Sequence, residues 1–111
     1  KIPPALAPIK AAILPLIKKD GLPEIGQEIA NELKIDFNIQ IDQKDSIGKR
    51  YRRQDAIGTP VCITIDHDTR KDKSVTIRYR DTMKQERVEI SELTSILNKE
   101  LGWKTLLSNL N

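Results

Sequence analysis

The sequence predicts an α/β fold, built on a single mixed five-stranded sheet with three packed helices. In the first half of the chain, apolar strand-like segments alternate with segments of helical spacing, which favours parallel strands joined by helical crossovers. In the second half, alternating segments follow one another across polar turns, which favours antiparallel pairing at one side of the same sheet. The expected order is β-α-β-α-β-β-β-α.

The first three elements are a buried strand, a helix and a half-buried strand. Residues 7–16 are nearly continuously apolar, as expected for a central strand covered on both faces. Residues 22–34 carry apolar side chains at helical spacing, and Pro23 fits the first turn, where a missing amide hydrogen is tolerated. Residues 37–41 alternate apolar and polar side chains, which indicates a strand with one face in the core.

A basic helix is expected next. Ser46 is its cap, because a serine hydroxyl can accept a hydrogen bond from an unpaired first-turn amide. Ile47 and Tyr51 lie one turn apart and face the core, and Gly58 with Pro60 ends the helix. The opposite side of the helix is expected to present four cations: Lys49, Arg50, Arg52 and Arg53.

The rest of the chain predicts strands followed by a helix. The strands are expected within residues 61–66, 75–80 and 83–90. A polar turn at residues 68–73 joins the first two of them. Ser91 then opens a last helix that runs toward Trp103.

Size and composition limit what this chain can do. Its 111 residues suit one domain, with residues 1–7 as an incoming linker and residues 8–111 as the domain itself. The net charge is only +3, so nucleic-acid binding would have to come from clustered cations. No apolar run reaches the roughly 18 residues of a membrane span, and the expected location is the cytoplasm.

Few residues support catalysis or metal binding. Cys62 is the only cysteine, which excludes an internal disulfide, and its place in a strand favours a packing role over a reactive thiol. His67 lies between Asp66 and Asp68, but adjacent strand residues point to opposite faces and the chain has no second histidine. No phosphate-binding glycine loop or nucleophile motif is present. We therefore expect no catalytic, cofactor-binding or metal site in this chain.

The cations of the basic helix have two interpretations. Like charges one turn apart repel by a few tenths of a kcal/mol, which phosphate groups of a nucleic acid would relieve. The alternative is a solvated helix face with Asp45 and Asp55 as partial partners.

The polar face of the last three strands is the sharper signal. Because side chains alternate along a strand, these residues lie on the face of the sheet opposite the apolar face. They are Thr64, Asp66, Thr76, Arg78, Arg80, Gln85 and Arg87. Cross-strand Arg–Asp pairs on an ordinary exposed sheet would explain them. However, unpaired RNA bases present donors and acceptors on their edges, and cytosine in particular offers an amino donor to Asp and acceptor atoms to Arg.

Several ordered runs resemble a known family. They are Ala7-Pro-Ile-Lys-Ala-Ala-Ile-Leu-Pro-Leu16, Gly48-Lys-Arg-Tyr-Arg-Arg-Gln-Asp55, Gly58-Thr-Pro60 and Thr76-Ile-Arg-Tyr-Arg-Asp-Thr-Met-Lys-Gln-Glu-Arg-Val88. Together they resemble the C-terminal anticodon-binding domain of class II aminoacyl-tRNA synthetases, and within that group the dimeric glycyl-tRNA synthetases most of all. The resemblance covers nearly the whole chain.

The resemblance implies a function and partners. It implies a non-catalytic domain that reads the anticodon of glycine tRNAs, whose second and third anticodon positions are cytosines. It also implies an upstream catalytic domain that uses ATP and Mg²⁺, in a homodimeric, non-membrane ligase. The residues expected to contact tRNA are Lys49, Arg50, Arg52, Arg53, Thr64, Asp66, Arg78, Arg80, Asp81, Gln85 and Arg87. For Asp81 a role in capping the turn is the alternative.

Two other functions stay open at this stage. The same fold serves sister synthetases for threonine, proline or histidine. A small α/β domain can also be a regulatory or dimerisation module that touches no RNA, because one architecture hosts many functions.

Overall fold

The computed structural model describes residues 7–101 and shows one mixed sheet. Its strands are β1 (Ala11–Pro15), β2 (Ile39–Ile41), β3 (Val61–Ile65), β4 (Ser74–Tyr79) and β5 (Gln85–Glu89). They lie in the order β2-β1-β3-β4-β5. β1 pairs in parallel with β2 and β3, whereas β4 and β5 add to β3 as antiparallel strands. The predicted five-stranded mixed sheet is confirmed.

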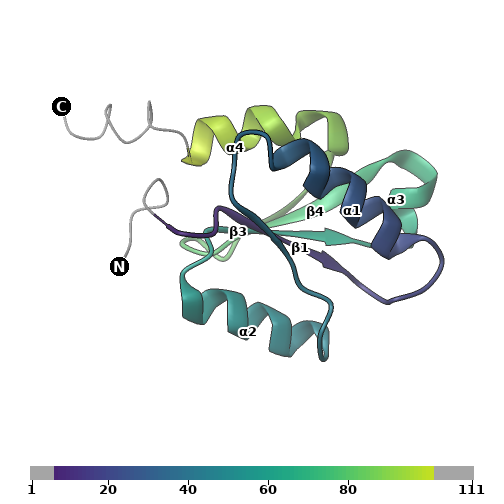
Figure 1. Cartoon of the computed structure of the whole chain (residues 1–111), viewed down its shortest axis with the longest axis horizontal. Helices are drawn as coiled ribbons and strands as arrows, with labels where there is room; N and C mark the ends of the chain where they lie inside the picture. The colour runs from purple at the N-terminus through teal and green to yellow at the C-terminus, as the bar shows by residue number, and fades with distance from the viewer. Residues whose placement is uncertain (1–6, 102–111) are drawn as a thin grey trace.

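Helices pack on both faces of this sheet. The described helices are α1 (Leu22–Leu33), α2 (Ile47–Ile57), α3 (His67–Asp72) and α4 (Leu93–Leu101). Figure 1 shows α1 and α4 on one side of the sheet and α2 on the other. The larger core lies under α1 and α4, where Ile29 and Leu97 pack with strand residues such as Ile63. Under α2 a smaller cluster joins Ala12, Leu14 and Cys62 with Ile47 and Tyr51.

The helix α3 corrects the expected polar turn at residues 68–73. The side chain of Asp66 accepts a hydrogen bond from the amide of Thr69, and the Thr69 hydroxyl accepts one from the amide of Asp66. This reciprocal capping box satisfies two amides at the start of the helix. Lys73 then ends it in the left-handed conformation, with φ 57°. A helix this short buries only Thr69, so it leaves no apolar period in the sequence.

The start of the last helix also differs from the expectation. Ser91 lies inside a 3₁₀ turn, η2 (Ile90–Glu92), and not at the cap of α4. β5 ends at Glu89, although the amide of Ile90 still donates to the carbonyl of Lys73 in the register of the ladder, and the chain then turns into η2. The expected continuation toward Trp103 lies outside the described residues, as does most of the expected linker at residues 1–7.

Two strands are shorter than predicted. β1 covers Ala11–Pro15 of the expected residues 7–16, and β2 covers Ile39–Ile41 of the expected residues 37–41. The predicted bounds were too wide because an apolar pattern reports which side chains are buried, and burial extends beyond the hydrogen-bonded strand. Ala7, for example, is buried although it precedes the first paired residue. Within residues 7–101, none of the helices has the length and apolar character that a membrane crossing requires.

Candidate nucleic-acid interface

The predicted polar strand face exists. Thr64 lies opposite Thr76, and Thr76 lies opposite Arg87, while Arg78 lies opposite Gln85. The face is the one on which α2 packs, because the Tyr51 hydroxyl of α2 lies 2.6 Å from the hydroxyl oxygen of Thr64. Toward β5 the face opens to solvent, since Gln85 and Arg87 are exposed. We call this surface, together with Asp66 and Arg80 at the strand ends, the strand face.

Arg78 joins the strand face to α2. Its guanidinium donates to both carboxylate oxygens of Asp55, at 3.0 and 3.1 Å, and stacks over the Tyr51 ring with 4.9 Å between the guanidinium carbon and the ring centroid. One Nη2–H also lies 3.2 Å from the Met83 sulfur. The hydrogen bonds with Asp55 raise the pKa of Arg78 above its ordinary value. Arg78 is only 7% exposed and Asp55 about a third, so a partly buried ion pair holds α2 and β4 together.

A second bidentate pair lies at the other side of the face. Arg87 donates to the two carboxylate oxygens of Asp66 at 2.6 and 2.8 Å. Its other N–H groups donate to the Ser74 hydroxyl, the Ser74 carbonyl and the Thr76 hydroxyl. All five donors of this guanidinium are therefore used within the domain. These hydrogen bonds lower the pKa of the Asp66 carboxyl, which stays ionised and about a quarter exposed.

The remaining predicted strand-face residues lie near the turn between β4 and β5. Arg80 donates from Nε to the carbonyl of Asp55, at 3.2 Å, and its Nη1 lies 3.4 Å from Asp81. Asp81 and Gln85 are exposed. Thr64, by contrast, is buried and bonded to Tyr51, so it supports the aromatic ring and is not presented on the surface.

The basic helix α2 begins as predicted, but one of its cations points inward. Ser46 caps α2, with 3.4 Å between its hydroxyl oxygen and the amide of Lys49. Arg50 was expected among the outward cations, yet only 3% of it is exposed. Its guanidinium donates to the carbonyls of Pro15 (2.6 Å), Leu16 (3.1 Å) and Asp42 (3.1 Å). Position 50 faces the sheet because it lies one residue from Tyr51 and about one turn from Ile47.

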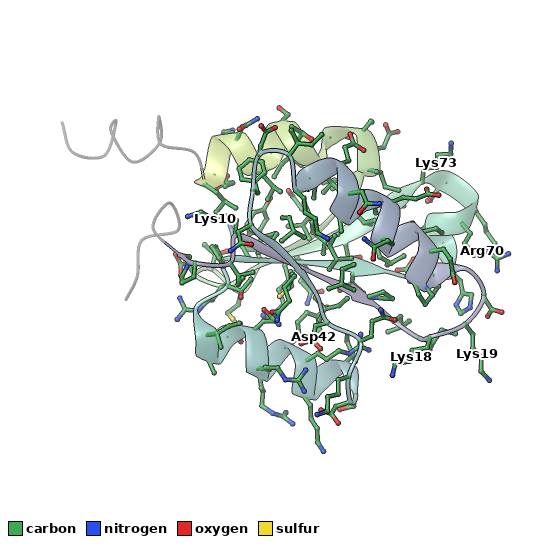
Figure 2. All side chains as sticks on the ribbon, in the orientation of Figure 1. Lys10, Lys18, Lys19, Asp42, Arg70 and Lys73 are labelled. Carbon is green, nitrogen blue, oxygen red and sulfur yellow. The ribbon has the colours of Figure 1, made fainter. Side chains whose placement is uncertain are left out.

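Arg53 is also engaged by neighbouring residues. It donates to Asp42 at 2.6 and 2.8 Å and to Asp45 at 2.6 Å. Figure 2 shows Asp42 between the sheet and α2, where it is buried. Burial favours a higher pKa for Asp42, but hydrogen bonds from Gln54 and Arg53 outweigh it and lower the pKa. Of the acidic partners that the alternative interpretation gave to the helix cations, Asp45 does pair with Arg53.

Lys49 and Arg52 are the outward cations of α2. Both are exposed, and neither has a salt bridge or side-chain hydrogen bond among the described residues. Asp55, the second expected partner of the helix cations, pairs with Arg78 instead. The surface charge available to a ligand on α2 is therefore that of Lys49 and Arg52.

The geometry offers no metal or thiol chemistry in the described part of the chain. No group of three potential metal ligands occurs between residues 7 and 101. His67 begins α3, and its Nε2 lies 3.0 Å from Asp20. Burial raises the pKa of Cys62 to about 12, so its thiol stays protonated near neutral pH.

Three exposed cations outside the strand face were not singled out from the sequence. Lys18 and Lys19 follow the first predicted strand, and Arg70 lies in the expected polar turn at residues 68–73. All three are exposed, at the end of the molecule where the loop after β1 meets α3 (Figure 2). The like charge of Lys18 and Lys19 was the available signal, but only the topology brings their loop beside α3.

Comparison with known proteins agrees with this geometry. Residues 10–100 match the family model described as the anticodon binding domain. The chain belongs to that family. The expected resemblance to class II synthetase domains is thereby confirmed.

Three similar relatives of this anticodon-binding domain are named glycine–tRNA ligase. It is 53% identical to the glycine–tRNA ligase of Treponema denticola over 98 residues, which are 88% of this chain and 22% of that protein. It is 61% identical to that of Clostridium beijerinckii over 98 residues, covering 88% and 21%. With Rhodopirellula baltica the identity is 54% over 105 residues, covering 95% and 20%. The chain spans about a fifth of the length of these curated relatives.

Solved structures share the fold of this domain. The RNA binding domain of threonyl-tRNA synthetase from Cryptosporidium parvum superposes with a TM-score of 0.81 at 25% identity, covering 91% of this chain and 26% of that one. Prolyl-tRNA synthetase from the same organism, complexed with L-proline and AMP, gives a TM-score of 0.81 at 24% identity, covering 89% and 22%. The second likeness shows the fold alone.

Proposed function

We propose that this chain is the anticodon-reading part of a glycine–tRNA ligase. The named relatives support glycine over threonine or proline, because identities of 53–61% with glycine–tRNA ligases far exceed the 24–25% with the threonyl- and prolyl-tRNA synthetases. The parent protein would activate glycine with ATP and Mg²⁺ in an upstream catalytic domain. It would act as a homodimer in the cytoplasm, and this chain would supply tRNA contacts and no catalytic group.

The observation that carries the proposal is the carboxylate of Asp66, fixed on the strand face by Arg87. Oδ1 of Asp66 accepts from Thr69 and Arg87, whereas Oδ2 accepts only from Arg87. Oδ2 therefore keeps a lone pair for a further donor. The exocyclic amino group of cytosine is such a donor. Because every N–H of Arg87 is already used, Arg87 positions Asp66 and does not itself bond a base.

Arg78 supplies the complementary donors. Two of its N–H groups bond Asp55 and one meets Met83, which leaves Nε–H and the second Nη1–H for acceptor atoms on a base. Its plane stacks on Tyr51, so the direction of these donors is set before RNA arrives. Gln85, opposite Arg78 and exposed, extends the same row of polar groups.

Phosphate contacts come from a different set of residues. Lys49 and Arg52 on α2 are the exposed cations beside the strand face, whereas Arg50 and Arg53 are engaged within the domain. Arg80 and Asp81 bond one another next to the turn and border the face. Phosphate contacts position a nucleic acid and base contacts specify it, so the two sets predict separable effects.

The test is binding of the 111-residue chain to two hairpins across a salt series. One hairpin carries a glycine anticodon stem-loop, and the other has both shared anticodon cytosines replaced. We expect the chain to prefer the first hairpin. In Asp66→Asn the preference should shrink by about 1–3 kcal/mol, the size of a good base contact. In Lys49→Ala both affinities should fall together, and the salt slope should drop by about one.

Asp66→Asn is chosen because it leaves the helix cap of α3 in place. Asn keeps the capping role of Asp66, so Asp66→Asn removes charge and acceptor geometry but not α3. Equal binding of the two hairpins by the wild-type chain would refute base reading. In the same assay, preference for a third hairpin that carries a threonine, proline or histidine anticodon would assign the chain to a sister synthetase. No RNA binding at any salt concentration would favour the regulatory or dimerisation domain.

A further inference from the structure

Cations outside the strand face gather at the carboxyl ends of the parallel strands. Lys18 and Lys19 lie in the loop after β1, and Arg70 lies in α3, which follows β3. All three are exposed, and within residues 7–101 none of them has an ion-pair partner. Figure 2 shows them at the end of the molecule where the loop after β1 meets α3. We call these three residues the basic edge.

The topology makes this a position where α/β sheets bind ligands. The chain leaves β1 through α1 to reach β2 on one side, whereas β3 lies on the other side of β1 and continues to β4. The strand order thus switches direction between β1 and β3, with α1 and α2 on opposite faces (Figure 1). Ligands of open α/β sheets bind outside the carboxyl ends of the strands at such a point. The basic edge occupies the loops that leave those two strands.

The loop that carries the lysines is fixed at both of its ends. At the first end, the amide of Leu16 donates to the carbonyl of Ile65 at 2.8 Å, and Arg50 donates to the carbonyl of Leu16 at 3.1 Å. At the second end, Asp20 bonds His67 of α3 at 3.0 Å. The two lysines lie between these anchors. A ligand therefore meets a loop whose path is already set, and it has little backbone to order on binding.

Three acidic groups near the basic edge, Asp20, Asp66 and Asp72, have hydrogen-bond partners within the domain. Asp66 is bonded to Arg87, and Asp72 accepts from Ser74. The pKa of Arg87 is raised by its hydrogen bonds with Asp66, and the charges of Asp66, Asp72 and Asp68 raise it further. Their charge is partly compensated. The cations of the basic edge stay available for an anionic partner.

The basic edge continues the strand face. Asp66, the proposed base acceptor, is followed in the chain by His67. His67 bonds Asp20, and Asp20 follows Lys19. A strand of RNA whose bases contact Asp66 would pass its backbone next to Lys19. A lysine ammonium suits a phosphate there, because it is a compact charge with rotatable donors.

We propose that the basic edge binds phosphates of the RNA backbone while the bases lie on the strand face. The proposal rests on the proposed function for the identity of the RNA, but it concerns different residues and a different readout. Each lysine–phosphate contact on a single strand adds about 0.7 to the slope of log affinity against log salt. Two lysines therefore account for about 1.4 of the slope.

The test compares Lys18→Gln/Lys19→Gln with Lys34→Gln in the same 111-residue chain. Lys34 is the matched control, since it is an exposed lysine without an ion-pair partner among the described residues, after the opposite end of α1. Binding is measured with the glycine hairpin and with the cytosine-replaced hairpin, from 50 to 400 mM salt. The double variant should lose about 1.4 from the slope with both hairpins, which corresponds to about 25-fold in affinity at 0.1 M salt relative to 1 M. Its preference between the hairpins should stay at the wild-type ratio.

The outcomes separate this inference from the proposed function. A double variant with the wild-type slope, or with the same slope as Lys34→Gln, overturns the basic edge while leaving base reading intact. A wild-type chain that binds both hairpins equally, together with a double variant of lower slope, refutes base reading and supports the basic edge as an RNA contact. Unchanged thermal unfolding of each variant shows that charge, and not folding, is what changed.

Discussion

Replacing Arg50 by methionine should destabilise the domain far more than any other arginine of α2. Its guanidinium is 97% buried and donates to three carbonyls at the carboxyl ends of β1 and β2. Methionine fills a similar length but offers no donor. The carbonyls of Pro15, Leu16 and Asp42 would therefore lose the partner that Arg50 now supplies.

The expected loss in unfolding free energy combines the three hydrogen bonds with the desolvation of the guanidinium. Hydrogen bonds to a charged group contribute about 1.5–3 kcal/mol each, so three sum to about 4–9 kcal/mol. Burying the guanidinium costs several kcal/mol, which methionine recovers, and Nε of Arg50 already finds no partner in the described residues. The expected net loss in unfolding free energy is about 2–4 kcal/mol.

Urea unfolding measures this difference directly. With a slope near 2 kcal/mol per molar urea, the midpoint of Arg50→Met should fall by about 1–2 M. Arg52→Met is the control, because it makes the same chemical change two residues further along α2, on an exposed side chain. There the effect on the unfolding free energy should stay within about 0.5 kcal/mol. Equal midpoints for the two variants would refute the reasoning that Arg50 ties the strand ends to α2.

Three further outcomes are expected. In a double-mutant cycle at pH 7, Asp55→Ala and Arg78→Ala should couple by about 1–3 kcal/mol in unfolding free energy, and additive effects would contradict the partly buried ion pair. The pKa of Asp66 is lower folded than unfolded, so its contribution to stability is full above about pH 4 and is lost as pH falls through the folded pKa. Asp66→Asn should therefore flatten the acid limb of the stability curve, and an unchanged limb would contradict this. Cys62, buried and with its pKa raised to about 12, should react with a thiol reagent at pH 7.5 only after urea unfolds the chain, and rapid labelling of the folded chain would show that the strand opens.

Much of the strand face was predictable because strand side chains alternate strictly. Once Val75 and Ile77 are assigned to the core, Thr76 and Arg78 must lie on the other face, and the observed register confirms it. The short helix α3 was not predictable in this way. Its capping box is local, but six residues with one buried threonine give no helical period.

The basic helix shows where pattern reasoning reaches its limit. Helical spacing places Arg50 near the boundary between the buried and exposed sides, next to Tyr51. Which side it takes depends on whether carbonyls from β1 and β2 are near enough to bond it, and those come from residues 8 and 35 positions away along the chain. Two arginines of the same helix therefore have different roles: Arg50 bonds the strand ends, whereas Arg52 is exposed to solvent.

By itself, the sequence determined the sheet, its mixed strand directions and the polar face, because these depend on periodicity and on the order of elements along the chain. Tertiary structure alone decided which charges remain available to RNA. Arg87 is used up in holding Asp66, Arg53 is paired with Asp42, and Lys18 and Lys19 are brought beside α3. The physical reason is that a hydrogen bond or ion pair depends on distances of about 3 Å between side chains that are far apart in the sequence, and no local pattern encodes such distances.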